Sequence, residues 1–255
     1  MTLEFGLLNR KELRQAAELA ARAFSDYEYF TNWFPDPKER AKVEIAIIWC
    51  SYKTNFSSAP QLTAKLDGKI VATAELNAPD HKAPSVLSYI LHGWIKVYMA
   101  ASLKRVNDWI AMDAAASQSC HDYQKTAPGI WYLSSLSTDP SMQGIGLGTK
   151  LMEYYENYIR EHGGKQVVLV TNSQKNLNFY LKRGYEVFDE QVFEYNDHKM
   201  GSWSMKRSCK QLPVLYNLHS LPMGEGRGGG VTCHSASLVP PPLWTEEDLS
   251  SCISL

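Results

Sequence analysis

The residues best placed for chemistry form a glycine-rich run in front of a predicted helix. Glycine lets the backbone come close to a ligand, and the unpaired N–H groups of the first helical turn point at an anion with the helix dipole behind them. The run therefore predicts a phosphate-binding loop. Its residues are Gln143, Gly144, Ile145, Gly146, Leu147, Gly148 and Thr149.

The spacing of the glycines excludes two common phosphate sites. A P-loop needs Gly-x-x-x-x-Gly-Lys-Ser/Thr, but here the lysine, Lys150, comes one place late. A dinucleotide fingerprint needs Gly-x-Gly-x-x-Gly, and its third glycine would fall on Thr149. The pattern that remains is Gln-x-x-Gly-x-Gly, which runs from Gln143 to Gly148.

The elements on both sides must position this loop. A strand-like run ends before it at Asp139-Pro140, and a second strand is predicted at residues 166–171. Between them an apolar stripe indicates a helix, since its members recur at helical spacing. The stripe consists of Leu151, Met152, Tyr155 and Ile159.

Two motifs in this order resemble the GNAT superfamily of acetyl-CoA-dependent acetyltransferases. The Gln143 to Gly148 pattern resembles the acyl-CoA motif Gln/Arg-x-x-Gly-x-Gly/Ala, and the run from Phe179 to Tyr185 resembles the end of the following helix, Phe/Leu-Tyr-x-x-x-Gly-Phe/Tyr. The resemblance is close over residues 130–207 and holds only in outline before them. The segment from His121 to Gly148 looks like the branch that contains puromycin-type and many uncharacterised small-molecule acetyltransferases. That branch often carries a histidine just before the Trp-Tyr-Leu run, where this chain has Ile130.

The resemblance implies a mixed α+β fold, with a mostly antiparallel, splayed sheet of about seven strands flanked by helices. A helical insertion is expected before the acyl-CoA strand. The residue patterns agree with this fold. They predict a strand at residues 3–8, helices at 10–24 and 39–52, a hairpin of 61–66 and 69–76, helices at 85–101 and 103–123, and a closing hairpin of 185–195 and 199–206.

The chain is expected to form one catalytic domain over residues 1–207. Residues 208–255 change in character, with a glycine run at 224–230 and three prolines at 240–242. Such a segment has few periodic apolar positions, so we predict a disordered tail there.

The resemblance also implies roles for residues along the cofactor. Backbone groups of Leu136, Ser137 and Thr138 would pair with the pantetheine arm of acetyl-CoA. Tyr180 would be the general acid, because a phenol with a pKa near 10 stays protonated at neutral pH and can donate to the leaving sulfur. Asn176 or Asn172 would bond the pantetheine arm. The alternative is helix capping for Asn172 and solvent exposure for Asn176.

The general base is open between two residues. Glu75 lies on the strand before the insertion and could take the proton directly or through water, although strand glutamates are more often exposed. His121 has an ordinary pKa near 6.5 that suits the task. The amine could also arrive neutral, with water carrying its proton away.

The acceptor is expected to contact residues 24–37 and the insertion. The first segment mixes aromatic and acidic side chains, which favours a small amine over a polyanion. Its members are Asp26, Tyr27, Glu28, Tyr29, Phe30, Trp33, Phe34 and Asp36, and Trp94 and Tyr98 of the insertion are expected to extend the wall.

Composition narrows the partners. The formal net charge is −1, so no global field recruits nucleic acid or an anionic membrane. The five cysteines lack paired metal-ligand spacing, and the amino terminus shows no signal-peptide pattern, so we expect a cytoplasmic protein without a metal. The expected partner is a small-molecule amine, and a homodimer stays open.

Two other functions remain compatible with the sequence. A protein acetyltransferase acting on lysine or N-terminal amines would need an extended groove for a peptide. A non-catalytic acyl-CoA-binding module would bind acetyl-CoA without transferring its acetyl group. The absent histidine at Ile130 and the unassigned base are the features that keep this second alternative open.

Overall fold

A computed structural model describes residues 2–142 and 144–209, and within them seven strands form one sheet of order β1-β2-β3-β4-β5-β7-β6. Neighbouring strands are antiparallel except for β4 and β5, which are parallel. This confirms the mixed, mostly antiparallel fold. The strands are β1 Leu3–Leu7, β2 Gln61–Leu66, β3 Lys69–Asn77, β4 Ile130–Thr138, β5 Gln166–Thr171, β6 Glu186–Tyr195 and β7 His198–Ser208.

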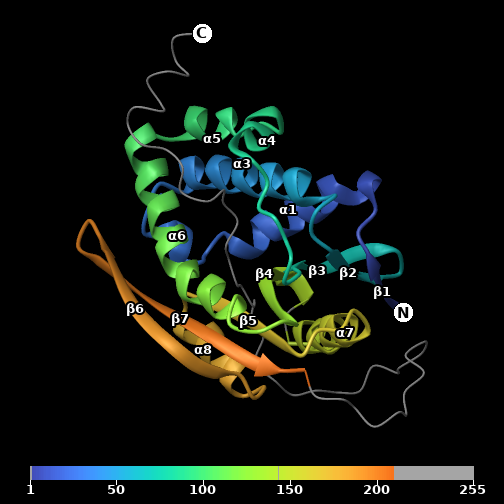
Figure 1. Cartoon of the computed structure of the whole chain (residues 1–255). Coiled ribbons are helices and arrows are strands. Elements are labelled where there is room, and N and C mark those ends of the chain that lie inside the picture. The colour runs from blue at the N-terminus through green and yellow to red at the C-terminus, as the bar shows by residue number, and fades with distance from the viewer. Residues whose placement is uncertain (1, 143, 210–255) are drawn as a thin grey trace.

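Helices cover both faces of the sheet (Figure 1). On one face α1, α3 and α6 pack together, with α4 and α5 lying over α3 as an outer layer, whereas α7 and α8 lie on the other face. The helices are α1 Leu13–Phe24, α2 Glu28–Thr31, α3 Pro37–Asn55, α4 Val86–Leu91, α5 Ile95–Ala100, α6 Leu103–Gln124, α7 Leu147–Glu161 and α8 Gln174–Leu181.

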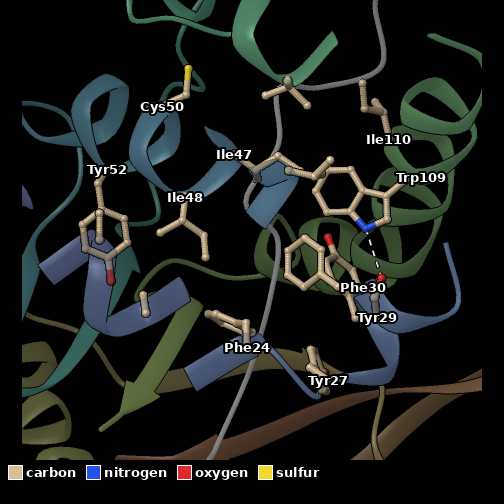
Figure 2. Close-up of a cluster of buried hydrophobic side chains, with 14 of the residues drawn as sticks. Phe24, Tyr27, Tyr29, Phe30, Ile47, Ile48, Cys50, Tyr52, Trp109 and Ile110 are labelled. Carbon is tan, nitrogen blue, oxygen red and sulfur yellow. Dashed lines mark hydrogen bonds between the residues drawn. The ribbon is translucent and has the colours of Figure 1, made fainter. Parts of the chain in front are cut away.

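Each face of the sheet has its own hydrophobic core. The larger core packs α1, α2, α3 and α6 against the sheet, and aromatic rings dominate it (Figure 2). The Phe30 and Trp109 rings stack at 5.4 Å, and the Trp109 indole N–H donates to the Tyr29 carbonyl at 3.1 Å. Because a buried indole needs a partner, this bond fixes α2 against α6.

The α7 core confirms the predicted apolar stripe. Leu151, Met152, Tyr155 and Ile159 are all buried against strands β3, β4 and β5. Burying four large side chains on one face holds the helix close to the sheet. The glycine-rich loop therefore opens a helix whose position is fixed.

The insertion is divided more finely than its sequence pattern predicted. The expected helix at residues 85–101 is two short helices, α4 and α5, because Gly93 turns the chain with a φ of +107°. The Ser85 hydroxyl begins α4 by accepting the Ser88 N–H at 3.3 Å. The last helix of the insertion, α6, spans 22 residues.

The other helix boundaries also differ slightly from the prediction. Helix α3 begins earlier, at Pro37, because the Asp36 carboxylate caps it by accepting the Glu39 N–H at 2.7 Å. Helix α1 is preceded by a 3₁₀ turn, Arg10–Glu12. The one-turn helix α2 was not predicted, since four residues are too few for a periodic pattern.

The carboxyl end of the described chain is tied to the sheet. Strand β7 pairs with β5 up to Ser208, and the Cys209 N–H donates to the Lys165 carbonyl at 2.9 Å. The fold thus reaches two residues past the expected domain end at residue 207. Residues 210–255, where the rest of the predicted tail falls, lie outside the described residues.

Candidate active site

Strands β4 and β5 part in the middle of the sheet. They pair only from Ile130 to Tyr132, after which β4 bonds only to β3 while β5 continues along β7. Leu136, Ser137 and Thr138 lie in the diverging part of β4 and are buried. The Ser137 hydroxyl has no hydrogen-bond partner among the described residues. The split therefore offers backbone and hydroxyl groups to a ligand.

A β-bulge at Ser134 marks the start of this split. Glu75 pairs with Ser135 and Leu76 with Leu133, so Ser134 is an extra residue opposite β3. The insertion of one residue keeps Leu133 and Leu136 on the same face of the sheet, in the α7 core. It also turns the Ser134 hydroxyl toward the Glu75 carboxylate, to which it donates at 3.1 Å.

The glycine loop leads into the amino terminus of α7. Gly144 and Gly146 have φ values of +88° and +77°, which residues other than glycine rarely adopt. A Cβ at Gly146, the N-cap, would meet no atom of the described structure within 4 Å. The space in front of the first helical turn is thus open for an anion.

The other loop residues divide between solvent and core. Leu147 and Gly148 are buried and anchor the helix start, whereas the Ile145 side chain is exposed. Gln143, the first residue of the motif, lies outside the described residues. The anchoring explains how a loop with two left-handed glycines keeps one position relative to the sheet.

Arg183 brings a positive charge to the same helical turn. Its Nε and Nη2 atoms donate to Thr149 Oγ1 at 3.0 and 2.6 Å, and its guanidinium stacks over the Phe179 ring at 3.5 Å. A cation near a helix amino terminus is unfavourable by itself, because the dipole is positive there. It becomes favourable when an anion binds between them, so the arrangement suits a pyrophosphate.

Asn172 is the clearest candidate for the pantetheine arm. It directly follows β5, is fully buried, and neither its Oδ1 nor its Nδ2 has a partner among the described residues. Only its backbone is engaged, since the Asn172 N–H donates to the Tyr27 hydroxyl at 2.8 Å. An unpaired buried amide costs on the order of 1–3 kcal/mol, which a ligand with amide groups would recover.

Asn176 and Ser173 settle the capping question. The Ser173 hydroxyl caps α8 by accepting the Asn176 N–H at 3.4 Å, so Asn172 is not the cap. Asn176 is also buried, not solvent-exposed as the pattern of a surface helix would suggest. Both asparagines thus lie inside the protein at the end of β5.

These features fit acetyl-CoA. The open helix terminus with its arginine would hold the pyrophosphate, and the free amide of Asn172 and the diverging edge of β4 would hold the pantetheine arm. Tyr180 is fully buried on α8, in the core that also contains Leu136 and Leu147. Its ring lies 5.2 Å from that of Tyr185, whose hydroxyl is 2.6 Å from that of Tyr155.

Glu75 is a buried carboxylate on the opposite face. It is 1% exposed and accepts hydrogen bonds from Asn55 Nδ2 at 2.9 Å, Gln61 Nε2 at 2.9 Å and Ser134 Oγ at 3.1 Å. Burial raises the pKa of its carboxyl to about 7, against the lowering effect of these bonds. Glutamates on strands are usually exposed, but Glu75 is not.

His121 lies apart from Glu75. It is on α6, half-buried, with its ring 4.9 Å from the Tyr132 ring, and burial together with Lys125 lowers the pKa of its imidazole. It is not among the groups that act on the Glu75 carboxyl. The two candidate bases are therefore not brought together, and Glu75 is the one at the bulge.

Another buried acid, Asp113, was not predicted. It lies on α6, is 2% exposed, and accepts a hydrogen bond from the Tyr29 hydroxyl. Burial raises the pKa of its carboxyl to about 7. Burial, followed by the nearby Asp113 carboxyl, also raises the pKa of the Tyr29 phenol. A sequence signal existed, since position 113 continues the buried helical stripe of Trp109 and Ile110.

A cavity of about 340 Å³ lies between α2 and the start of α8. Asp26 and Glu28 line it with exposed carboxyl groups, and Tyr27 and Asn176 connect it to the end of β5. The other aromatics expected to form the acceptor wall belong to the core. Tyr98 is half-buried against it, and the others, Tyr29, Phe30, Trp33, Phe34 and Trp94, are buried.

Comparisons with known proteins agree with this geometry. Residues 24–185 match the model of the Acetyltransferase (GNAT) family. The fold is similar to an N-acetyltransferase from Staphylococcus aureus Mu50, with 11% identity, a TM-score of 0.50, and 82% of this chain and 100% of that chain covered.

A second similar structure is described as histone acetyltransferase HPA2 and related acetyltransferase, from Corynebacterium glutamicum. It is 16% identical, with a TM-score of 0.53 and coverage of 84% of this chain and 100% of that one. At such identities the two likenesses concern the fold alone. A comparison with curated protein sequences found no significant match.

Proposed function

The chain belongs to the GNAT family of acetyltransferases, and from that premise we propose that it transfers the acetyl group of acetyl-CoA to the primary amine of a small molecule. The observation that carries the proposal is Glu75, a carboxylate buried at the point where β4 leaves β5. With a pKa raised to about 7, roughly half of it is ionised at neutral pH.

Residues of the α7 face hold the cofactor. The first turn of α7, Gly146 and Arg183 bind the pyrophosphate, while Asn172 and the backbone of β4 at Leu136, Ser137 and Thr138 bind the pantetheine arm. When bound, acetyl-CoA supplies an acetyl group activated as a thioester.

Proton transfer is divided between two residues. The amine nitrogen bonds to the acetyl carbonyl carbon, the carbon–sulfur bond breaks, and the proton that leaves the nitrogen goes to the Glu75 carboxylate. The Tyr180 hydroxyl donates its proton to the departing sulfur. Asn55 and Gln61 keep the Glu75 carboxylate oriented, because each donates to one of its oxygens.

The acceptor enters through the cavity beside α2. Asp26 and Glu28 outnumber the one cationic side chain on its wall, Lys175, and would attract a cation, and its half-open space of about 340 Å³ has room for a small molecule. This supports a small amine as substrate. Lysine side chains and protein amino termini are the alternative acceptors.

The test is the release of free CoA thiol from acetyl-CoA in the presence of single amines. The panel contains aminonucleosides, polyamines and aminoglycosides, together with lysine-containing peptides. Release with a small amine and none with peptides supports the proposal, and release with peptides alone contradicts the acceptor class. Acetyl-CoA binding without release for any amine would instead indicate a non-catalytic module.

A further inference from the structure

An apolar patch covers the outer side of the inserted helices. Most of the large apolar side chains that the described structure exposes come from α4, α5 and the start of α6. Leu91 is 73% exposed and Met99 80% exposed. The patch, defined here as the insertion patch, consists of Leu87, Ile90, Leu91, Ile95, Met99 and Leu103.

Helical spacing explains why these side chains lie together. Leu87 and Leu91 are four residues apart on α4, as are Ile95 and Met99 on α5, so each pair lies on one helical face. The opposite faces bury Tyr89 and Val97. Because α4 and α5 form the outermost layer over α3 (Figure 1), the patch faces away from the domain. Several exposed apolar side chains gathered on consecutive helices point to an interaction site, whereas single exposed residues do not.

The surroundings of the patch are basic. The sequence from residue 81 to residue 107 contains four lysines and arginines and no aspartate or glutamate. Lys104 and Arg105 pair with Asp108 and Glu39. Lys82 and Lys96 are exposed, and neither is in an ion pair within the described structure. The net charge of −1 for the whole chain therefore hides a locally positive, apolar surface.

We propose that the insertion patch docks on the surface of an anionic lipid bilayer. Apolar side chains flanked by lysine are what the interface of such a bilayer binds, since the chains enter the acyl boundary while the amines stay among the headgroups. The same charges disfavour a second copy of this chain, because symmetric pairing of the patch would bring the unpaired lysines of both copies into one interface. The docking is peripheral, because none of the described helices is long and apolar enough to cross a membrane.

The proposed docking leaves the cofactor side of the protein open. Helix α7 and its glycine loop lie on the face of the sheet opposite to α4 and α5 (Figure 1). The proposal does not depend on the chemistry at Glu75, so its test measures binding to lipid alone.

The experiment is co-sedimentation of the full-length chain with vesicles. One set contains phosphatidylcholine alone and the other phosphatidylcholine mixed with phosphatidylserine. We expect binding to the mixed vesicles only, and weaker binding when the salt concentration is raised. Leu91→Ser combined with Met99→Ser should weaken that binding at least about tenfold, because the two most exposed apolar anchors of the patch are lost.

A matched control is Val192→Ser on β6, since Val192 is 61% exposed and outside the patch. Lys96→Glu tests the electrostatic part and gives a second reading if the double variant does not fold. Failure to bind either vesicle overturns the proposal, as does an equal loss in the Val192 variant. A dimer in light scattering that the double variant dissociates would also overturn it and make the patch a self-interface.

Discussion

The two faces of the sheet contribute to the site in different ways. On the α7 face the groups proposed to hold the cofactor come from residues 136–183, and they combine backbone groups of β4 and the start of α7 with the side chains of Asn172 and Arg183. On the α3 face the groups are side chains, and Glu75 meets partners from α3, β2 and β4. Cofactor binding is thus a local property of the chain, whereas proton chemistry depends on long-range burial.

The largest effect should come from removing the Glu75 charge. We expect Glu75→Gln to lower turnover about 10²- to 10⁴-fold, the range for a lost general base, with acetyl-CoA affinity nearly unchanged because Glu75 is not among the residues proposed to hold the cofactor. Turnover is measured as CoA release at saturating amine, and affinity by calorimetric titration.

The matched control is Glu156→Gln on α7. Glu156 is also buried, and burial raises the pKa of its carboxyl. It lies on the α7 face of the sheet, away from the Glu75 carboxyl, and forms an ion pair with Arg207. Its variant should keep normal turnover. If both variants lower turnover equally, the loss follows from removing any buried carboxyl group, and the role of Glu75 as base is wrong.

The Tyr180 hydroxyl should have the next largest effect. If it donates a proton only as the carbon–sulfur bond breaks, Tyr180→Phe keeps ring packing and loses about 10²-fold in turnover with little change in acetyl-CoA affinity. Tyr185→Phe is the control, because that ring is buried beside Tyr180 and its hydroxyl is paired with Tyr155. A matched loss of turnover and affinity in Tyr180→Phe would make it a cofactor contact instead.

The pH dependence of turnover tests whether the α3 face supplies the base. Glu75 must be ionised to accept a proton, and its pKa is raised to about 7, so kcat should fall about tenfold per pH unit below 7 and level off above it. Asp113 has a carboxyl pKa of about 7 as well. Asp113 could therefore produce the same pH dependence, and Asp113→Asn separates the two groups. If Glu75 is the base, the pH profile of this variant is unchanged; if the profile loses its fall below pH 7, Asp113 on α6 is the base instead.

The same raised pKa values fix the sign of a stability effect. A carboxyl whose pKa is higher in the folded state than in the unfolded state favours folding in its protonated form. Glu75 contributes this stability fully below its ordinary value of 4.5 and loses it as the pH rises through about 7. Thermal melting should accordingly show a falling Tm between these pH values, to which Asp113 adds in the same direction.

A smaller loss is expected on the α7 face. Gly146→Asp adds a side chain and a negative charge where the pyrophosphate would lie, so acetyl-CoA affinity should fall at least about tenfold, or about 1.4 kcal/mol. Gly68→Asp is the control, because Gly68 has nearly the same φ, +79°, and equally open space, in the β2–β3 turn. Unchanged affinity in the calorimetric titration of Gly146→Asp would contradict the loop assignment.

The contrast between the faces also explains what the sequence could predict. The loop, the helix stripe and β5 follow from local patterns, and the structure has β5 at the predicted residues. The state of Glu75 does not, because its partners Asn55, Gln61 and Ser134 lie 20, 14 and 59 residues away. No local pattern reports that β3 is buried on both faces at this position.

The acceptor wall shows the same limit. An aromatic and acidic segment such as residues 24–37 has the same composition whether its rings line a pocket or fill a core. Packing against Trp109 of the insertion decides the matter, and that contact joins segments 80 residues apart. Of this segment, Asp26, Tyr27 and Glu28 line the cavity, together with residues 173–176 at the start of α8.

The smallest effect is expected from removing the tail, which tests whether the two faces complete the domain by themselves. Ser208 pairs with Gln166, and Cys209 is buried with its N–H bonded to Lys165, so the chain should be ended after Cys209. We expect the Tm of this truncation to differ little from that of the full chain, because residues 210–255 lack a periodic apolar pattern. Ending the chain after Arg207 should lower the Tm instead, since it removes the last β7 pair and that backbone bond. A large loss already after Cys209 would mean that the tail packs on the domain. A loss of CoA release by the same truncation would then mean that the tail also contributes to the active site.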